Sequence, residues 1–280
     1  MAGKRFKQIE VRRRDLRIPI PDDFEDKLSG RKITHIGRRA KYIVVQCDDG
    51  TALLVHLGMS GRMVILQEAD AAMPGGFVHG PQGQDLSKER GTGWGAHDHV
   101  IFHMEDGVRI VFNDHRRFGL MALAAQDRLA HHKLLKDIGV EPLGNGFSGP
   151  YLAKMLHGRK TPIKAALLNQ HVVAGIGNIY ACEALFRAGI SPRRSSHTIG
   201  PKRAEKLVAA VKAVLADAIE AGGSTLRDYA HADGELGYFQ HKFSVYDREG
   251  ETCVSPGCAG KIKRIVQSNR STFFCGFCQR

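Results

Sequence analysis

The feature that most constrains the fold of this chain is a group of four cysteines within its last 28 residues. Cys253 and Cys258 form a C-x4-C turn, and Cys275 and Cys278 form a C-x2-C turn sixteen residues further on. Two such turns that face each other place four thiolates at the corners of a tetrahedron, the geometry of a structural Zn²⁺ site. So short a tail cannot bury enough apolar surface to fold alone, so we expect one structural zinc ion to supply much of its folding free energy.

A disulfide-stapled tail is the competing interpretation of these cysteines. We expect no signal peptide, and the other two cysteines, Cys47 and Cys182, are isolated in the sequence. Both points favour the metal site. We expect Cys47 and Cys182 to be small buried hydrophobic residues rather than reactive groups.

The charge balance points to a polyanionic partner. Among 280 residues, 41 Lys and Arg stand against 29 Asp and Glu, which gives a formal net charge of +12. Nucleic acid and an anionic membrane surface both suit such an excess. No apolar run approaches the roughly 18 residues of a membrane span and no basic amphipathic helix stands out, so nucleic acid is favoured over a membrane. A small anionic substrate remains open from composition alone.

The first part of the chain has the pattern of β-strands. Short runs rich in Val, Ile and Leu follow one another up to about residue 125, and Asp49-Gly50 and Asp106-Gly107 mark hairpin turns between them. Strands in such succession indicate a sandwich or a barrel. Residues 67–96 are Gly-rich and aperiodic, which predicts a long exposed loop.

The hydrophobic period becomes helical from about residue 127. The segment from Pro201 to Gly222-Gly223 is a predicted helix whose apolar face comprises Leu207, Val211, Val214, Leu215, Ala218 and Ile219. Two more predicted helices are "PYLAKMLHG" and "IYACEALFRAGISP", and "KIKRIVQSNRSTFFC" is a predicted hairpin with Arg270 at its turn. We predict an α+β fold with a β-sandwich lobe (1–125), a helical lobe (126–240) and a zinc-ribbon hairpin held by four cysteines (241–280).

A glycine pair opens one of these helices. Gly175 and Gly177 precede Asn178, and Tyr180 stands where a dinucleotide-binding fingerprint requires a third glycine. The backbone N–H groups at this helix start suit a single phosphate, and Asn178 can donate to the same phosphate. Simple capping by Asn178 is an equally good interpretation.

Two predicted turns carry side chains that could enter a DNA duplex. In "NDHRRFGL", Phe118 could wedge between bases while Arg116 fills the vacancy, although such Arg pairs are usually solvated strand ends. In "HLGMSGR", Met59 is a similar apolar tip, with a buried methionine as the alternative.

Several basic residues suit contacts with phosphates, which give affinity without sequence preference. They are Lys41, placed within a strand beside Arg38 and Arg39, the "GRKTPIK" residues Arg159, Lys160 and Lys164, and Arg270 on the hairpin. His97 and His99 alternate across a predicted strand and do not form a convincing metal site.

Taken together, these segments resemble the bacterial formamidopyrimidine-DNA glycosylase family, in family order from about residue 3 to 280. The relative endonuclease VIII branch shares the plan, but "DHRRFG" and "GVEPLG" look more like the formamidopyrimidine branch. The motifs that carry the resemblance are "RRAKY", "HLGMSG", "HDHV", "DHRRFG", "GVEPLG", "KTPIKAALLNQ", "VVAGIGNIYACEALFRAGISP", "GGSTLRDY", "GYF" and "RSTFFCGFCQ".

The resemblance implies a base-excision repair enzyme of the cytoplasm and nucleoid, whose helical lobe is of the helix-two-turns-helix type. We expect a monomer by default, because no interface signal stands out. It would remove oxidised purines from damaged duplex DNA by extruding the nucleotide and would then nick the abasic strand by β,δ-elimination. Lys41 would be the proton donor in β-elimination, and Arg270 would hold the phosphates of the flipped nucleotide. Met59, Arg116 and Phe118 would fill the hole, and the further DNA contacts would be His97, Arg159 or Lys160, and Asn178.

The chain departs from the family pattern at its start. The family opens Met-Pro-Glu-Leu-Pro-Glu, followed by a helix, with the proline amine as nucleophile; this chain opens "MAGKRFKQIEV". A misassigned start, a lesion-binding protein without catalysis, and a substitute amine such as that of Ala2 or Lys41 are the three explanations. We expect an upstream-extended chain to be more stable, because the missing helix would cover apolar surface on the β lobe.

A third class of function rests on charge and cysteines alone. A ribosome- or RNA-associated zinc-ribbon protein would bind RNA in preference to a duplex that contains an abasic site. The order of the motifs argues against it.

Overall fold

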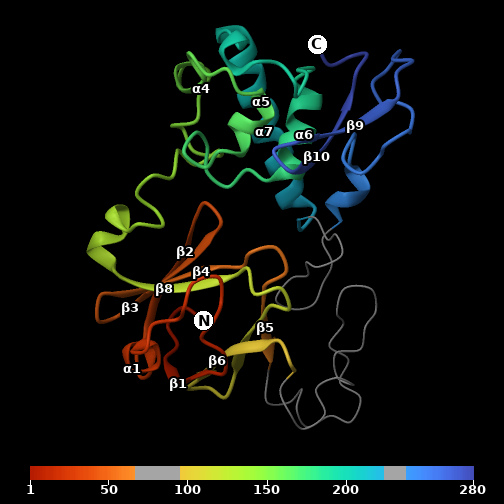
Figure 1. Ribbon diagram of the computed structural model, residues 1–280. Coiled ribbons are helices and arrows are strands. Elements are labelled where there is room, and N and C mark those ends of the chain that lie inside the picture. The colour runs from red at the N-terminus through yellow and green to blue at the C-terminus, as the bar shows by residue number, and fades with distance from the viewer. Residues whose placement is uncertain (67–94, 224–237) are drawn as a thin grey trace. The chain divides into compact units, whose positions relative to one another are not determined.

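The computed structural model describes residues 1–66, 95–223 and 238–280 (Figure 1). The described residues form two compact units, the first within Met1–Lys136 and the second made of Asp137–Gly223 and Tyr238–Arg280. The loop expected at 67–96 lies outside the described residues except for its last two positions. Among the described helices, none combines the length and the apolar character that crossing a membrane requires.

The described part of the first unit contains two antiparallel four-stranded sheets. One has the order β1-β6-β7-β5 and the other β2-β3-β4-β8. A short helix α1 (Phe24–Leu28) joins the sheets, and a 3₁₀ turn η1 (Gln126–His131) follows the last strand. The strands are β1 (Phe6–Val11), β2 (Ile33–Arg39), β3 (Tyr42–Cys47), β4 (Thr51–His56), β5 (Arg62–Leu66), β6 (Asp98–Met104), β7 (Arg109–Asn113) and β8 (Leu120–Ala125).

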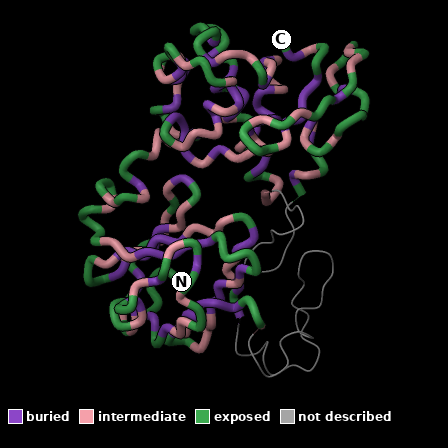
Figure 2. Tube along the Cα trace, in the orientation of Figure 1, coloured by how far each residue is buried: buried purple, intermediate pink, exposed green. Residues whose placement is uncertain are grey.

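The hydrophobic core of the first unit draws on both sheets, which makes the unit the predicted sandwich. Phe6 of β1 and Phe102 of β6 are in ring contact, with centroids 5.6 Å apart, and Phe24 of α1 meets Phe102 edge-on at 6.5 Å. Val45 and Leu53 contribute from the second sheet. Figure 2 shows the buried residues gathered along these strands, with exposed residues at the turns. The β-branched and aromatic residues of the sequence runs therefore cover each other between the sheets.

An apolar cavity of about 170 Å³, partly open to solvent, adjoins this core. Its lining is wholly apolar and comes from both sheets, with Phe6, Ile110 and Met63 on one side and Val45 and Val55 on the other. A partly open apolar cavity of this kind leaves its lining side chains short of packing contacts and exposed to water, which lowers the stability of the unit.

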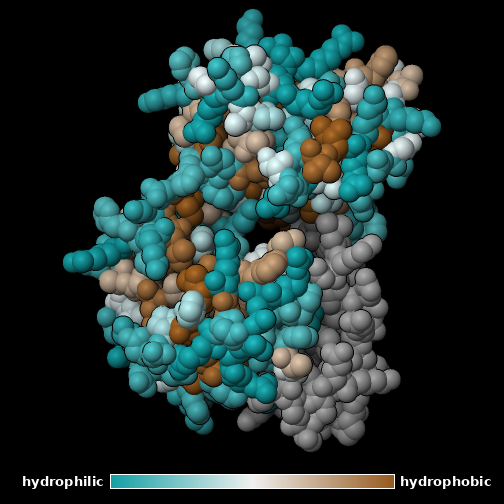
Figure 3. All heavy atoms as spheres, in the orientation of Figure 1, coloured by the Kyte–Doolittle hydropathy of each residue, from teal (hydrophilic) through white to brown (hydrophobic). Residues whose placement is uncertain are grey.

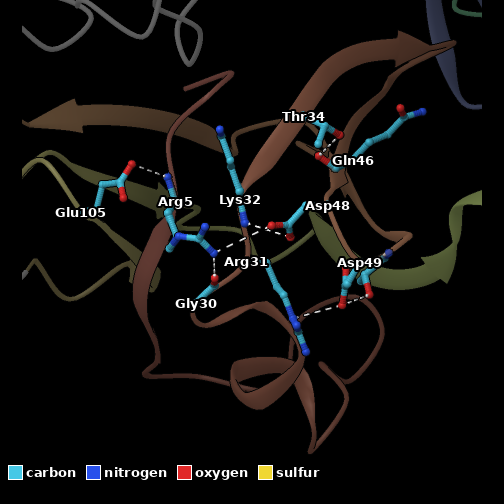
Figure 4. Close-up of polar contacts among 10 residues, drawn as sticks. Arg5, Gly30, Arg31, Lys32, Thr34, Gln46, Asp48, Asp49 and Glu105 are labelled. Carbon is cyan, nitrogen blue, oxygen red and sulfur yellow. Dashed lines mark hydrogen bonds and ion pairs between the residues drawn. The ribbon is translucent and has the colours of Figure 1, made fainter.

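Polar contacts tie the loops at one end of the sandwich (Figure 4). The Arg5 N–H donates to Glu105 at 3.1 Å, and its guanidinium donates to the Gly30 carbonyl. Arg31 forms an ion pair with Asp49 at 3.0 Å. These pairs are largely exposed, so each contributes little to stability by itself.

The turns between strands confirm one prediction and correct another. The predicted Asp-Gly turns contain Gly50 at φ +82° and Gly107 at φ +83°, the left-handed conformation that such turns require. Lys41, however, does not lie within a strand: β2 ends at Arg39, and Ala40 (φ +52°) and Lys41 form a tight turn before β3. The continuous run "RRAKYIVV" concealed this turn because it contains no Gly, Asn or Pro.

The second unit has a helical core. Its helices are α4 (Gly149–Leu156), α5 (Ile163–Leu168), α6 (Asn178–Arg187) and α7 (Pro201–Glu220), with 3₁₀ turns η2 (Ser196–Thr198) and η3 (Phe239–Lys242). The predicted helix from Pro201 is confirmed as α7, with Leu207, Val211, Val214 and Ala218 buried. Ile219 was wrongly assigned to the buried face, because it lies in the last turn and is 67% exposed.

The C-terminal residues form the predicted hairpin. Strands β9 (Ile262–Gln267) and β10 (Arg270–Cys275) pair antiparallel, with Arg270 opposite Gln267. Ser268 and Asn269 both have positive φ, as a two-residue hairpin turn demands. Ile262 and Phe273 pack with Cys182 and Val245 in a small core that joins the hairpin to α6.

Candidate nucleic-acid interface and metal centre

The four C-terminal cysteines come together in the second unit. Their Sγ atoms all lie within 4.8 Å of one another, and the pairs Cys253–Cys278 and Cys258–Cys275 are each 3.7 Å apart. Metal–sulfur bonds of about 2.3 Å in a tetrahedron would place the sulfurs about 3.8 Å apart. The donor set and its spacing therefore fit a single tetrahedral metal ion.

The thiols of the cluster differ in pKa: burial raises the pKa of Cys278 to about 12, whereas Cys275 is shifted toward the thiolate. Burial raises the pKa of the Cys275 thiol, but N–H groups of the Cys278 and Phe277 backbone outweigh this and lower it to about 7. Gly260 is required beside the cluster, because a Cβ there would lie 2.7 Å from the Cys275 sulfur. A deprotonated thiol is the form that binds a metal.

The cysteine-bearing tail, which we call the finger (Cys253–Cys278), is fixed to α6 by a buried carboxylate. Glu183 is 0% exposed and accepts hydrogen bonds from the backbone N–H groups of Ser244, Val245 and Tyr246 at 2.8–3.0 Å. Three donors satisfy a charge that would otherwise be costly to bury. The segment that leads into the finger is therefore held to the helical core.

A second polar anchor lies directly beside Arg270. The carbonyl of Ser271 accepts from Lys164 Nζ at 3.0 Å and from Asn178 Nδ2 at 2.9 Å. Lys164 also donates to Thr272 Oγ1 at 2.6 Å and is 1% exposed, so the predicted phosphate contact by Lys164 is wrong. Burial lowers the pKa of this lysine, Cys182 opposes the shift, and the charge of Arg270 adds to it.

Arg270 itself is exposed at the start of β10, where the hairpin turn ends. Because Lys164 and Asn178 both donate to the carbonyl of Ser271, the backbone next to Arg270 is held in place. A guanidinium held in this way is suited to a phosphate group.

The glycine-containing loop before α6 is also strapped in place. The side chain of Gln170 accepts from the Gly175 N–H at 2.8 Å and donates to the Ile176 carbonyl at 3.2 Å. Gly177 is the N-cap and Asn178 the first residue of α6. The side-chain N–H2 of Asn178 is turned to Ser271, so the first-turn backbone N–H groups are the donors this helix start can offer to a phosphate.

Arg159 and Lys160 follow α4 in a supported loop. The carbonyl of Arg159 accepts from the His197 N–H at 2.9 Å, and the carbonyl of Lys160 accepts from the Ser195 hydroxyl at 3.1 Å. The Arg159 guanidinium donates to Met155 and is partly covered, while Lys160 is exposed. Of this pair, Lys160 is the more accessible cation.

The two predicted wedge tips of the first unit are neighbours. Met59, between β4 and β5, is 61% exposed, and Phe118, between β7 and β8, is 44% exposed. Their loops touch, because a Cβ on Gly58 (φ +71°) would lie 2.6 Å from the backbone carbon of Phe118. The guanidinium of Arg116 stacks on the Phe118 ring at 4.7 Å. Met59 and Phe118 are therefore large apolar side chains that stay exposed on a mostly hydrophilic surface (Figure 3).

A basic group surrounds His56 at the base of the Met59 tip. His56 Nδ1 accepts from the Gly58 N–H at 2.9 Å, and its ring stacks edge-on with Tyr42 at 5.0 Å. Burial lowers the pKa of His56, and the charges of Arg17 and Lys41 lower it further. Lys41 thus lies near a neutral imidazole and a second cation, on an exposed turn.

His97 is exposed in the turn before β6, not within a strand as predicted. Its ring lies 6.1 Å from that of His115 and 6.5 Å from that of the buried His99. The side chain of Asp98 accepts from the Gly95 N–H at 2.9 Å and fixes this turn.

Sequence reasoning missed the supporting residues of both units. They are Arg17, His56, Gln170 and Glu183; the last three lie within the quoted motifs, which did not indicate a supporting role for them. The one available signal was that Glu183 stands on the apolar side of a predicted helix, where a carboxylate needs dedicated partners.

The fold and these sites define a two-unit protein with a β-sandwich, a helical core and a cysteine-anchored finger. Family models assign both units: the formamidopyrimidine-DNA glycosylase N-terminal domain matches residues 1–121, and the formamidopyrimidine-DNA glycosylase H2TH domain matches residues 138–230. The chain belongs to the formamidopyrimidine-DNA glycosylase family, as its motifs indicated.

Full-length relatives and solved structures agree with this assignment. The chain is 51% identical to the formamidopyrimidine-DNA glycosylase of Beijerinckia indica and 52% identical to that of Cereibacter sphaeroides, covering 100% of this chain and 94% of each relative. A Lactococcus lactis Fpg variant bound to Fapy-dG-containing DNA superposes with a TM-score of 0.84 at 28% identity, covering 100% of this chain and 93% of that one. MutM (Fpg) of Thermus thermophilus gives 0.80 at 33% identity, covering 100% and 92%.

Proposed function

We propose that this protein is a base-excision repair glycosylase that removes oxidised purines from duplex DNA and nicks the resulting abasic strand by β,δ-elimination. The observation that carries the proposal is the pair of touching, exposed tips with Met59, Phe118 and an Arg116 guanidinium stacked on the phenyl ring. Apolar side chains presented together can fill the space that an extruded nucleotide leaves in the stack.

The basic residues bind phosphates and take part in the elimination steps. Lys41, an exposed cation, binds a backbone phosphate and donates the proton in β-elimination. Arg270 holds the phosphates of the flipped nucleotide and assists δ-elimination, and the first turn of α6 at Asn178 binds another phosphate. His97 and either Arg159 or Lys160 contact the duplex further away. The anchoring of Arg270 and the exposure of Lys41 support these roles.

One structural zinc ion occupies the finger in this proposal. The four thiolates match the ligand set and spacing of tetrahedral zinc, and four protein ligands leave no position for a reactive water. The ion therefore acts by holding the hairpin that carries Arg270. We also propose a three-part division at residues 1–125, 126–240 and 241–280, a monomeric state, and association with the bacterial nucleoid.

Binding and trapping on defined duplexes test the function. We expect the chain to bind a duplex with a tetrahydrofuran abasic-site analogue at least about ten-fold more tightly than the intact duplex, since the vacancy is already made. Substitution of Phe118 by Ala should remove most of that preference. Equal affinity for the two duplexes, or tighter binding to RNA, would contradict the proposal.

Borohydride trapping on a duplex with oxidised guanine then tests catalysis. A covalent adduct together with strand nicks supports the glycosylase and lyase assignment. Selective binding with neither adduct nor nicks supports instead the damaged-DNA-binding protein without catalysis.

A further inference from the structure

Asp114 is a buried residue to which neither the sequence motifs nor the proposed mechanism gives a role. It lies between β7 and β8 and is 0% exposed. A carboxylate in such a position costs free energy unless its oxygens are satisfied, so each oxygen needs a hydrogen-bond donor.

The carboxylate joins the two wedge tips. Oδ1 accepts from the hydroxyl of Ser60 at 2.6 Å, and Oδ2 accepts from the backbone N–H of Gly119 at 2.8 Å. Ser60 directly follows Met59, and Gly119 directly follows Phe118. The Asp114 side chain therefore bonds to the residue that follows each exposed wedge residue. Ser60 and Asp114 are 54 positions apart in the chain.

The backbone of Asp114 also reaches the turn that carries His97. Its N–H donates to the His97 carbonyl at 3.0 Å, and its carbonyl accepts from His99 Nε2 at 2.8 Å and from the Arg117 N–H at 3.2 Å. The residue thus holds the Met59 tip, the Arg116–Phe118 tip and the His97 turn at once.

We propose that Asp114 is the positioning residue that fixes the relative placement of the two wedge tips for insertion into damaged DNA. Gly58 and Gly119 allow the close approach that this requires, since a Cβ on Gly119 would lie 2.5 Å from the Phe112 ring. Tips that are already held together lose less conformational entropy when they enter the duplex. The hydrogen bonds of Asp114 therefore contribute to the preference for a damaged site. The inference rests on the proposed function of the tips.

Four variants separate this role from a general effect on folding. Asp114→Ala removes both bonds, and Ser60→Ala removes only the bond to the Met59 tip. Asp114→Asn keeps both links, because its oxygen can accept from Gly119 while its N–H2 donates to the Ser60 hydroxyl, which can also accept. Val45→Ala, in the core of the same unit, lowers stability without touching the tips.

The readout is the ratio of affinities for a tetrahydrofuran-containing duplex and the intact duplex, measured with the full chain by fluorescence anisotropy. We expect Ser60→Ala to lower this ratio about ten-fold, the loss expected for one hydrogen bond to a charged group, and Asp114→Ala, which removes both bonds, to lower it at least as much. Asp114→Asn and Val45→Ala should stay within about three-fold of the unsubstituted chain.

Each other outcome is decisive. A wild-type ratio in Ser60→Ala overturns the inference, and this variant decides alone if Asp114→Ala does not fold. A loss in Asp114→Asn as large as in Asp114→Ala, or an equal loss in Val45→Ala, also overturns it. If the unsubstituted chain shows no preference for the abasic analogue, the proposed function itself fails and this inference fails with it.

Discussion

His56 illustrates how a half-buried side chain supports an exposed tip. Its Nδ1 accepts the Gly58 N–H, one residue before Met59, and can do so only while the imidazole is neutral. Burial, Arg17 and Lys41 all lower its pKa below the ordinary value, so the environment keeps it in that form. The hydrogen bond and the electrostatics therefore favour the same protonation state.

Stability should consequently decrease in mild acid. The unfolded chain binds a proton at His56 near pH 6.5, whereas the folded chain does so only at lower pH, so the unfolding free energy is fully retained above about pH 6.5. It falls as the pH drops from there through the folded pKa. We expect His56→Asn, whose oxygen can replace Nδ1 as acceptor, to lessen this decline in melting temperature between pH 7.5 and 5.

The exposed His131 of η1 provides the matched control for that measurement. His131→Asn should leave the pH dependence unchanged. A decline that is identical in His56→Asn and the unsubstituted chain would show that His56 does not carry it.

At the scale of single elements, the finger depends on its cysteines more than on its packing. Cys275→Ser, or removal of metal by a chelator, should unfold the β9–β10 hairpin, because metal binding supplies much of the folding free energy of such a small element. We expect the affinity for abasic-analogue DNA to fall at least about ten-fold as Arg270 loses its anchor, while the α7 helix remains. Metal content by mass spectrometry and amide exchange in β10 would measure the two effects.

Cys47→Ala is the comparison for the finger variants. Cys47 is buried in the β-sandwich and far from the cluster in sequence, so its loss should leave one zinc per chain and an ordered hairpin. Loss of metal from Cys47→Ala, or a hairpin that stays protected without metal, would contradict this account of the finger.

A substitution in the sandwich core is expected to raise stability rather than lower it. The cavity of about 170 Å³ is lined by Val45 and Val55, among other apolar side chains. Val55→Ile would place one more methylene in it and should stabilise the first unit by about 0.5–1 kcal/mol. Thermal melts would show this as a higher transition temperature, whereas unrelieved overpacking would lower it.

Val208, on α7 in the second unit, gives the paired control, because it is buried and does not line this cavity. Val208→Ile should therefore bring no comparable gain. Equal effects at both positions would mean that the cavity is not the cause.

Local pattern predicted elements well where the signal lies within the element. The helix from Pro201, the Asp49-Gly50 turn and the cysteine cluster are each predicted by their own local sequence, and the structure confirms them. The turn at Lys41 was missed because Ala40, and not a glycine, adopts the positive φ, so the sequence contains no turn signal there. Ile219 was misassigned because a helical period does not show where the covering partner ends.

The supporting roles of Glu183 and Lys164 could not be predicted because their partners are distant in the chain. Glu183 receives its donors from residues 244–246, and Lys164 donates to residues 271 and 272. From sequence, Lys164 in "GRKTPIK" was another surface cation, and only the folded chain reveals it as buried. Motifs located exposed side chains on turns such as Met59 and Phe118, whereas the contacts of Glu183 and Lys164 required the tertiary structure.

At the scale of the whole molecule, the net charge of +12 should make the affinity for DNA depend on salt concentration. Each phosphate neutralised by a lysine or arginine releases counterions, so the logarithm of the affinity falls linearly with the logarithm of the salt concentration. The proposed contacts comprise two kinds of residue, cations that neutralise phosphates and wedge side chains that displace bases. Salt dependence distinguishes the two kinds within one assay.

Lys160→Ala and Arg270→Ala should each make the salt slope shallower by about 0.9, the amount expected for one lost phosphate contact on duplex DNA. Phe118→Ala should weaken binding to the abasic analogue while leaving the slope unchanged, because a phenyl ring releases no counterion. Titrations at four salt concentrations measure both quantities for each variant. A shallower slope in Phe118→Ala, or an unchanged slope in Arg270→Ala, would show that the cations and the wedges have been assigned to the wrong roles.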